Sequence, residues 1–463
     1  MSGFELSFFA KPVTQSVTYE SALTLEFAMT STRRHFLQAG AVGLGCATSG
    51  WFNKLAAAGE ADPGRKKACI LLWMNGGPST IDLWDLKPGH ENGGPFKAIK
   101  TDAPGLLFGE HLPGIANWGS RMAVLRGMST KEGDHSRATY QMRTGNLPLG
   151  GIQYPGLGGL ISKEIGDPKN ELPNCISIAP LRFFNVDAFG AGFLGPQYAP
   201  LVVADNVQQR AGLEINVDDV LKVQNLTRPT DVNKSHSDAR LEMLKQMQEE
   251  YGNTRPSGIA ASHQSAYDRA TRLMQSDAGK VFDLSQEKSQ ERDRYGRNLF
   301  GQGCLLARRL VEKGVAFVEV NLGDWDTHGN NFDRVKELCG SLDKAWAALM
   351  TDLKQRGLLD STLIVWMGEF GRTPRINGAQ GRDHYPGAWA TVLAGGGIKG
   401  GQAIGKTSAD GTTVEERRTS AVDLLATACS ALGIDPKKQN LSNVGRPIAI
   451  VDKSAEPVKE ILA

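Results

Sequence analysis

The sequence predicts an α/β fold with a mostly parallel central sheet flanked by helices. Short apolar runs closed by glycine alternate with longer stretches in which apolar residues recur at helical spacing. Strand, helix and strand in succession place parallel strands in one sheet with helices on its faces. A chain of 463 residues, 40% hydrophobic and 22% charged, is long enough to bury such a core.

Five apolar runs are expected to supply strands of this sheet. In chain order they lie in KKACILLWMNGG, MAVLRGM, VAFVEVNLG, STLIVWMGEFG and ATVLAGGG. Helical spacing predicts helices over 299–314 and 331–357, which end at Gly314 and Gly357. Ligands of a parallel sheet bind where strands end, so the loops after Met74, Val320 and Met367 are expected to meet.

The domain is expected to span 66–463. Its polar tract around 230–297, which includes DARLEMLKQMQEEYG and SQEKSQERDRYG, is interpreted as a helical insertion with a solvated charged face. The insertion is not expected to carry the chemistry.

The region 1–58 is interpreted as a twin-arginine export signal. Arg33 and Arg34 precede an apolar, Gly- and Ala-rich run that ends in three alanines at 56–58. Met29 lies just upstream, so 1–28 is interpreted as a misassigned start. The alternative is a mature amphipathic helix with a chance arginine pair. No other segment reaches the roughly 20 apolar residues that an integral membrane span needs, so we expect a periplasmic or extracellular protein.

Net charge argues against two kinds of partner. The formal charge of +2 comes from 52 basic and 50 acidic residues, which does not favour nucleic acid or an anionic membrane surface. A polar substrate must therefore be recognised locally. The sequence leaves the oligomeric state open.

The loop NLGDWDTHGNN, directly after an apolar run, is a candidate metal site. Asp324 and His328 are separated by three residues at a strand end, where a carboxylate and an imidazole can turn onto one cation. Such mixed ligands suit a divalent metal, zinc or manganese rather than calcium, which prefers oxygen, although calcium stays possible. The alternative is a turn in which a carboxylate satisfies the histidine.

A second candidate stretch is VWMGEFGRTPRINGAQGRDHYPGAW. Glu369 at a strand end can ligate a metal, and His384 follows in the next loop. Arg372, Arg375 or Arg382 can grip an oxyanion through two parallel hydrogen bonds. In the structural alternative, Glu369 and an arginine form an ion pair and GRDHYP is a turn.

These stretches, with LLWMNGGPSTIDLWDLKPG near the N-terminus, resemble the bacterial domain of unknown function 1501 family, a branch of the alkaline phosphatase and sulfatase superfamily. The resemblance implies an alkaline-phosphatase-like fold. Asp324, His328 and His384 match one metal site of that superfamily. Glu369 and Phe370 stand where a second site has Asp and His, and Asn75 stands where the first strand supplies Asp. The resemblance thus implies either one bound metal, or a second metal site that Glu369 and Asn75 complete.

The same resemblance bears on the nucleophile. Sulfatases carry Cys or Ser ahead of a Thr-Gly pair, and counting back from Thr144 and Gly145 in GDHSRATYQMRTGNLP reaches His135. His135, Ser136 or Ser79 is then a candidate nucleophile, with Arg372 as an oxyanion contact; otherwise a water activated by the metal attacks directly. The alternative for DHSRA is a helix N-cap at Asp134 or Ser136.

Taken together, the resemblance and the export pattern imply an exported, metal-dependent hydrolase of phosphate or sulfate esters, acting on a small or polymeric substrate. A non-catalytic, metal-stabilised binding protein for a glycan or a protein partner is the alternative. A redox protein is disfavoured because no Cys or Met cluster and no dinucleotide fingerprint is present.

Overall fold

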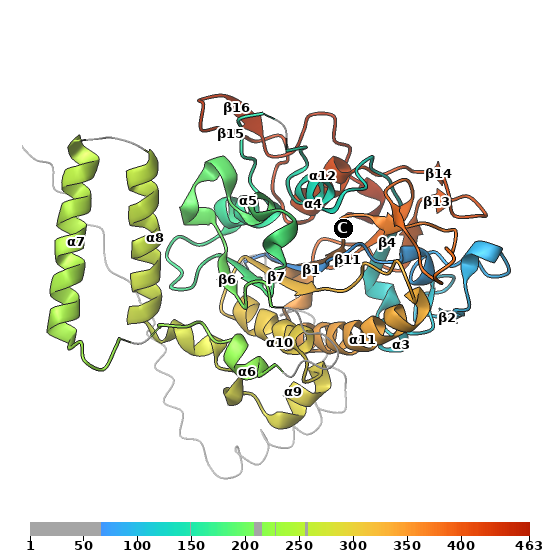
Figure 1. Ribbon diagram of the computed structural model, residues 1–463, viewed down its shortest axis with the longest axis horizontal. Coiled ribbons are helices and arrows are strands. Elements are labelled where there is room, and N and C mark those ends of the chain that lie inside the picture. The colour runs from blue at the N-terminus through green and yellow to red at the C-terminus, as the bar shows by residue number, and fades with distance from the viewer. Residues whose placement is uncertain (1–65, 149, 208–214, 227, 255–257) are drawn as a thin grey trace, which may run out of the picture. The chain divides into compact units, whose positions relative to one another are not determined.

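An eight-stranded sheet lies at the centre of a computed structural model that describes residues 66–463, except 149, 208–214, 227 and 255–257 (Figure 1). The strands lie in the order β12 (Gln402–Ile404), β4 (Met122–Met128), β11 (Trp389–Gly395), β8 (Thr362–Met367), β1 (Ala68–Met74), β7 (Phe317–Leu322), β5 (Cys175–Ile178) and β6 (Leu201–Val203). Strand β11 runs antiparallel to both of its neighbours, and the other pairs are parallel. The predicted mostly parallel sheet flanked by helices is confirmed.

The side chains of strand β1 are divided between two hydrophobic cores. Ile70 and Leu72 belong to a core that includes buried side chains of α10 (Leu299–Glu312) and α11 (Asn331–Gln355). Leu71 and Trp73 belong to a second core, which includes side chains of α5 (Leu157–Ile165) and α12 (Ala421–Ala431). Because both faces of the sheet are covered, neither face of β1 can be polar. Each fully buried side chain of this kind contributes roughly 1.5–3 kcal/mol.

The longest elements are those that the sequence predicts. The five apolar runs form β1, β4, β7, β8 and β11, and the two helical patterns form α10 and α11. Strands β5, β6 and β12 have only four, three and three residues, too few for a pattern that distinguishes a strand from a loop.

The remaining elements are short or peripheral. The other helices are α3 (Pro113–Ala116), α4 (His135–Thr144), α6 (Val217–Val220), α7 (Lys234–Thr254), α8 (Gly258–Gln275) and α9 (Ser289–Tyr295). Four two-stranded pieces are β2 (Ala98–Lys100) with β3 (Leu107–Gly109), β9 (Gly371–Arg372) with β10 (His384–Tyr385), β13 (Lys406–Thr407) with β14 (Val414–Glu416), and β15 (Gln439–Leu441) with β16 (Pro447–Ala449).

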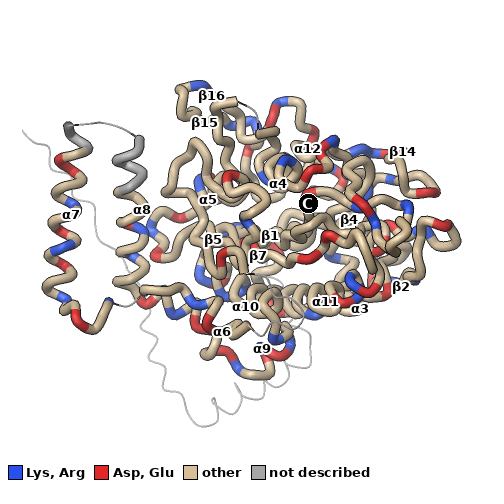
Figure 2. The backbone as a smooth tube through the Cα atoms, viewed as in Figure 1, with Lys and Arg blue, Asp and Glu red and all other residues tan. Residues whose placement is uncertain are grey.

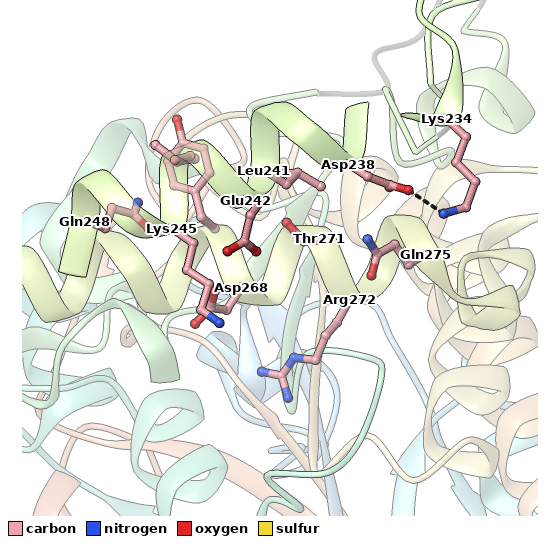
Figure 3. Close-up of a pocket in the computed structure, with 12 residues that line it drawn as sticks. Lys234, Asp238, Leu241, Glu242, Lys245, Gln248, Asp268, Thr271, Arg272 and Gln275 are labelled. Atoms are coloured by element: carbon pink, nitrogen blue, oxygen red, sulfur yellow. Dashed lines mark hydrogen bonds and ion pairs between the residues drawn. The ribbon is translucent and has the colours of Figure 1, made fainter. Parts of the chain in front are cut away.

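Helices α7 and α8 lie side by side within the polar tract 230–297, and acidic and basic residues alternate along them (Figures 1 and 2). A groove of about 750 Å³ between them is lined largely by charged and polar side chains, with an ion pair of 2.6 Å between Lys234 and Asp238 at one end (Figure 3). Among the described residues that line this groove there is no histidine or cysteine, so they offer none of the nitrogen or sulfur ligands that zinc prefers.

Within the part of the chain that the structure describes, no helix is long and apolar enough to cross a membrane. The predicted export signal at 1–58 lies outside the described residues.

Candidate metal centre

Three loops meet at the carboxyl ends of adjacent parallel strands, as the sequence predicts. The backbone N–H of Gly76, after β1, donates to Glu369 Oε1, after β8, at 2.9 Å. The N–H of Trp325, after β7, donates to the carbonyl of Asn75 at 3.2 Å. These contacts hold the three loops against one another and create one site at this edge of the sheet.

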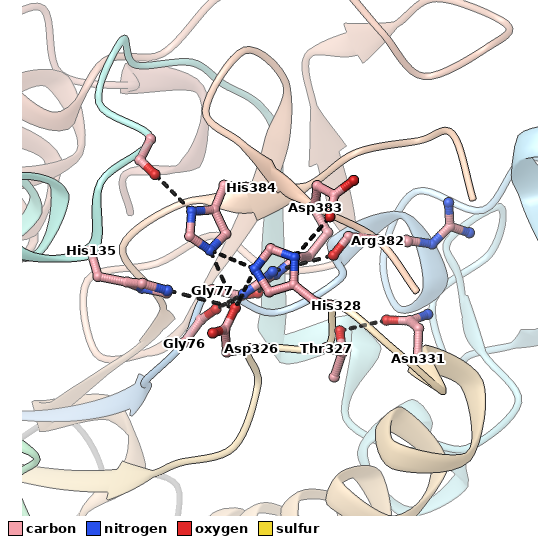
Figure 4. Close-up of polar contacts among 12 residues, drawn as sticks. Gly76, Gly77, His135, Asp326, Thr327, His328, Asn331, Arg382, Asp383 and His384 are labelled. Atoms are coloured by element: carbon pink, nitrogen blue, oxygen red, sulfur yellow. Dashed lines mark hydrogen bonds and ion pairs between the residues drawn. The ribbon is translucent and has the colours of Figure 1, made fainter. Parts of the chain in front are cut away.

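Asp326 is the centre of the site. Its Oδ1 atom lies 3.1 Å from His328 Nε2, 3.2 Å from His384 Nε2 and 3.6 Å from His135 Nε2 (Figure 4). The Nε2 atoms of His328 and His384 are themselves 3.0 Å apart. Ligand atoms around a tetrahedral zinc ion, with bonds of 2.0–2.1 Å, lie about 3.3 Å from one another. The distances observed here, from 3.0 to 3.6 Å, lie on both sides of that value.

The other ring nitrogen of each histidine faces an acceptor. Nδ1 of His135 lies 2.7 Å from Glu369 Oε1, Nδ1 of His328 lies 2.8 Å from Asp383 Oδ1, and Nδ1 of His384 lies 2.8 Å from the carbonyl of Gly133. A carbonyl or an ionised carboxylate only accepts, so each ring donates through Nδ1 and directs its Nε2 inward. Two Nε2 lone pairs at 3.0 Å repel unless a proton or a cation lies between them. Metal-binding histidines have this arrangement.

Charge at the site also favours a cation. Burial disfavours the charged form of His135, but the nearby carboxylates of Asp326 and Glu369 outweigh burial and raise its pKa to about 9. Burial likewise opposes ionisation of Asp326, yet the bonds from His135 and His384 and the charge of Arg372 hold its pKa well below the usual range. A metal must therefore displace a proton from His135, and binding is expected to compete with protons.

Two buried atoms show that the site is incomplete without a bound group. Nε2 of His135 and Oε2 of Glu369 have no hydrogen-bond partner among the described residues. Because an unpaired buried polar group is costly, such atoms mark a place where a ligand is needed. The residues present therefore fit a divalent cation.

Two phenylalanines frame the histidines. The ring of Phe370 lies 5.0 Å from that of His135 and 4.7 Å from that of His384. The ring of Phe184 stacks on His135 at 4.5 Å with an interplanar angle of 11°. Such packing limits rotation of the imidazoles and so maintains their direction.

Residues 66–462 match the model of a family described as protein of unknown function DUF1501. The chain belongs to this family. Its resemblance to the family, seen in the sequence motifs, is thereby confirmed.

Solved structures with a similar fold share little sequence with this DUF1501 chain. One is the PsFucS1 sulfatase from Pseudoalteromonas sp., with 15% identity over 82% of this chain and 71% of that one and a TM-score of 0.40. Another is the lipoteichoic acid synthase LtaP from Listeria monocytogenes, with 9% identity, 84% and 74% coverage and a TM-score of 0.39. A third is a protein of the alkaline phosphatase superfamily from Vibrio parahaemolyticus, with 13% identity, 81% and 68% coverage and a TM-score of 0.34. No curated protein matches the chain.

The candidate metal ligands predicted from the sequence separate into two groups in this DUF1501 chain. His328 and His384 lie in the cluster, and Glu369 is placed behind His135, where it receives Nδ1–H. Asp324 is outside the cluster: it has a left-handed backbone with φ of +68°, and its carbonyl accepts from Arg334 at 2.8 Å. Its neighbour Asp326, which the sequence motif did not single out, supplies the carboxylate.

Asn75 and Arg372 lie behind the site. Asn75 Nδ2 donates to the carbonyl of Leu181 at 3.5 Å, and its Oδ1 is buried with no hydrogen-bond partner in the described part of the chain. Arg372 has a fully buried side chain that donates to Asp326 and to the carbonyls of Gly76 and Gly77. It thus orients the central carboxylate from behind.

The candidate nucleophiles have different environments. His135 is the first residue of α4, and Asp134 caps that helix by accepting from the N–H of Arg137 at 3.0 Å. Ser136 Oγ accepts from Asn185 Nδ2 at 3.3 Å, and Ser79 Oγ donates to Asp82 Oδ2 at 2.6 Å. The cap at Asp134 and a role of His135 in the site are therefore compatible.

Gly381 allows the His328 loop and the His384 loop to touch, because a Cβ at this position would lie 1.8 Å from the carbonyl oxygen of His328. Gly381→Ala is expected to force these loops apart and to weaken metal binding without removing a ligand. Gly378→Ala is the matched control, since a Cβ there meets nothing within 4 Å. Metal affinity by competition with a chromogenic chelator measures the difference. Equal affinities in the two variants would contradict the contact.

Proposed function

We propose that this DUF1501 chain is a single-metal hydrolase of phosphate or sulfate esters, with His135, Asp326, His328 and His384 as metal ligands. One observation carries the proposal: three imidazole Nε2 atoms converge on one carboxylate oxygen while each Nδ1 is tied to an acceptor. The resemblance to the alkaline phosphatase and sulfatase superfamily supplies the substrate class.

The donor set favours zinc or manganese. Three nitrogens and one carboxylate suit these metals better than calcium, which prefers oxygen ligands. Such a metal, when bound, polarises an ester oxygen and lowers the pKa of water.

The remaining side chains maintain this arrangement. Arg372 holds Asp326 in the ionised form and in a fixed direction, and Glu369 and Asp383 hold the protons of His135 and His328 at Nδ1. Ser136 and Ser79 are engaged in hydrogen bonds. This supports water, rather than a serine, as the nucleophile in the proposal.

The proposed place of action is outside the cytoplasm, on a small or polymeric ester. The support is the twin-arginine pattern at Arg33 and Arg34. Cell fractionation of the full chain beside an Arg33→Lys, Arg34→Lys variant tests it, and export of both to the same extent would overturn it.

The proposal is tested by metal content and ester turnover. About one zinc or manganese ion per chain is expected after dialysis against each metal, with loss in His328→Ala and in His384→Ala. The loaded protein is then tested with aryl phosphates and aryl sulfates. Turnover that disappears in both variants supports the hydrolase. A metal-loaded chain without turnover supports the metal-stabilised binding protein instead, and a chain that takes up no metal overturns both.

Glu369→Gln tests the support of His135 separately. The neutral amide can still accept from Nδ1–H, but it makes the imidazole less basic, so metal affinity is expected to fall about 10- to 100-fold while the fold is retained. Glu132→Gln is the control, because Glu132 pairs with Arg137 at 2.7 Å a few residues before the same helix. A loss of affinity in both variants to the same degree would point to a general charge effect rather than to orientation.

A further inference from the structure

The loop after β5 reaches the same edge of the sheet as the metal centre. Strand β5 pairs in parallel with β7, whose loop carries Asp326 and His328. Two 3-10 turns follow β5, at Arg182–Phe184 and Val186–Phe189. Their side chains are therefore in a position to contact whatever binds at the metal.

A ladder of aromatic rings leads from the metal centre to the surface. Phe184 stacks on His135 with centroids 4.5 Å apart, and Phe183 packs on Phe184 at the same distance with an angle of 49°. Phe183, the outer ring, is 58% exposed, and Val186 beside it is 60% exposed. The exposed ring of Phe183 thus lies two ring contacts from His135.

The loop holds Phe183 outside the core. On one side, the backbone N–H of Arg182 donates to Asn206 Oδ1 at 2.9 Å, and its guanidinium donates to Asp205. On the other side, Asn185 Nδ2 donates to the carbonyl of Ser136 at 3.2 Å. Both sets of hydrogen bonds are made by the residues that directly flank the two phenylalanines in the sequence, Arg182 and Asn185. These hydrogen bonds fix the loop with Phe183 exposed. Because the loop is already ordered, little conformational entropy is lost when a ligand contacts the ring, so the surface is preorganised.

The same loop forms one wall of a cleft of about 260 Å³. Arg182, Val186, Asp187 and Phe189 line it from the loop, and Gln153 and Pro200 line it from other segments. Apolar surface and hydrogen-bonding groups therefore occur together in a cleft that this loop helps to form. This mixture is typical of sites that hold an organic group rather than an ion.

We propose that Phe183 is a specificity determinant that stacks against a ring in the alcohol part of the ester. The inference rests on the proposed function, because the anionic group must lie at the metal for its alcohol to extend over Phe184 and Phe183. A flat ring fills the surface that Phe183 offers, and a short acyclic alcohol does not. Phenyl rings and sugar rings share this shape, and the test distinguishes them.

Binding of paired anions that cannot be hydrolysed tests the inference. The metal-loaded chain is titrated by calorimetry with phenylphosphonate and methylphosphonate, and with benzenesulfonate and methanesulfonate. The ring-bearing member is expected to bind about 5- to 10-fold more tightly. Phe183→Ala is expected to reduce this preference to about 2-fold or less, and Phe183→Trp to retain it. Leu441→Ala, which truncates a 70% exposed side chain on β15, is the matched control and is expected to change nothing.

The outcomes separate the two proposals. A ring preference that depends on Phe183 supports the subsite even where no ester is hydrolysed, in which case only the hydrolase fails. Equal affinity within every pair tested, or preferences that persist in Phe183→Ala in every pair, overturn the subsite even where esters are hydrolysed. A phosphonate that carries a sugar ring, compared with one that carries glycerol, gives a third pair that cannot be hydrolysed: dependence on Phe183 here but not for phenylphosphonate identifies the ring as a sugar, and the reverse identifies it as aromatic.

Discussion

Asp326→Asn is expected to lose metal binding by more than the 10- to 100-fold that changes around a metal ligand usually cause. Asp326 Oδ1 lies within 3.6 Å of Nε2 of all three histidines. An amide of the same shape removes the negative charge and the strongest oxygen donor. It also leaves the buried charge of Arg372 without its carboxylate partner. Elemental analysis and chelator competition measure the loss, and turnover of any hydrolysed ester is expected to disappear with it.

Asp324→Asn is the matched control for this substitution. It makes the same chemical change two residues away in the same loop, and asparagine accepts the left-handed backbone at φ of +68° as aspartate does. We expect metal content close to that of the unchanged chain. If Asp324→Asn loses the metal and Asp326→Asn keeps it, the ligand assignment from the sequence motif is right and the assignment from the geometry is wrong. Circular dichroism of both variants separates loss of metal from loss of fold.

The sequence predicts the sheet well because its long strands are buried on both faces. An uninterrupted apolar run such as ACILLWM is most readily placed in the interior of a sheet that is covered on both faces, and the neighbouring strand β8, TLIVWM, is almost as apolar. Because the carboxyl ends of parallel strands lie at one edge of the sheet, the loops that follow β1, β7 and β8 are correctly predicted to meet there. Strands of three or four residues carry no such signal, so the outer part of the sheet is visible only in the structure.

The candidate site is less predictable because its ligand atoms depend on loop conformation. A spacing of three residues between Asp324 and His328 satisfies the superfamily pattern, but the pattern does not say which of two aspartates faces the histidines. The structure buries Trp325 and Thr327, so Asp326 and His328 alternate with them and lie on the other side of the chain. That alternation alone would include Asp324 as well. The left-handed backbone at Asp324, with φ of +68°, separates the two aspartates, and the tolerance of Asp for this conformation is the only hint that the sequence offers. The position of Asp383 beside His328 has no comparable signal.

Breaking the buried ion pair of Asp82 and Arg382 is expected to lower the free energy of unfolding by about 3–5 kcal/mol. Both side chains are fully buried, with Arg382 Nη2 2.8 Å from Asp82 Oδ1 and Arg382 Nε 3.0 Å from Asp82 Oδ2. Arg382→Met removes the cation and leaves a carboxylate without water or a charged partner. Urea unfolding followed by tryptophan fluorescence measures the change. Metal affinity is expected to fall too, because Arg382 lies two residues before His384.

The double variant Asp82→Leu, Arg382→Met shows whether the loss comes from the pair or from packing. With both charges absent, no unpaired ion is buried, so the double variant is expected to be more stable than Arg382→Met alone, even though Asn331 loses its acceptor on Asp82. Lys234→Met, at the exposed pair with Asp238, is expected to change the unfolding midpoint little, because water already screens that pair. A double variant less stable than either single one would mean that the pair contributes packing volume rather than charge compensation. Metal affinity is also measured for Arg382→Met and for the double variant. If the double variant recovers stability but not metal affinity, Arg382 has a positioning role for His384 in the site.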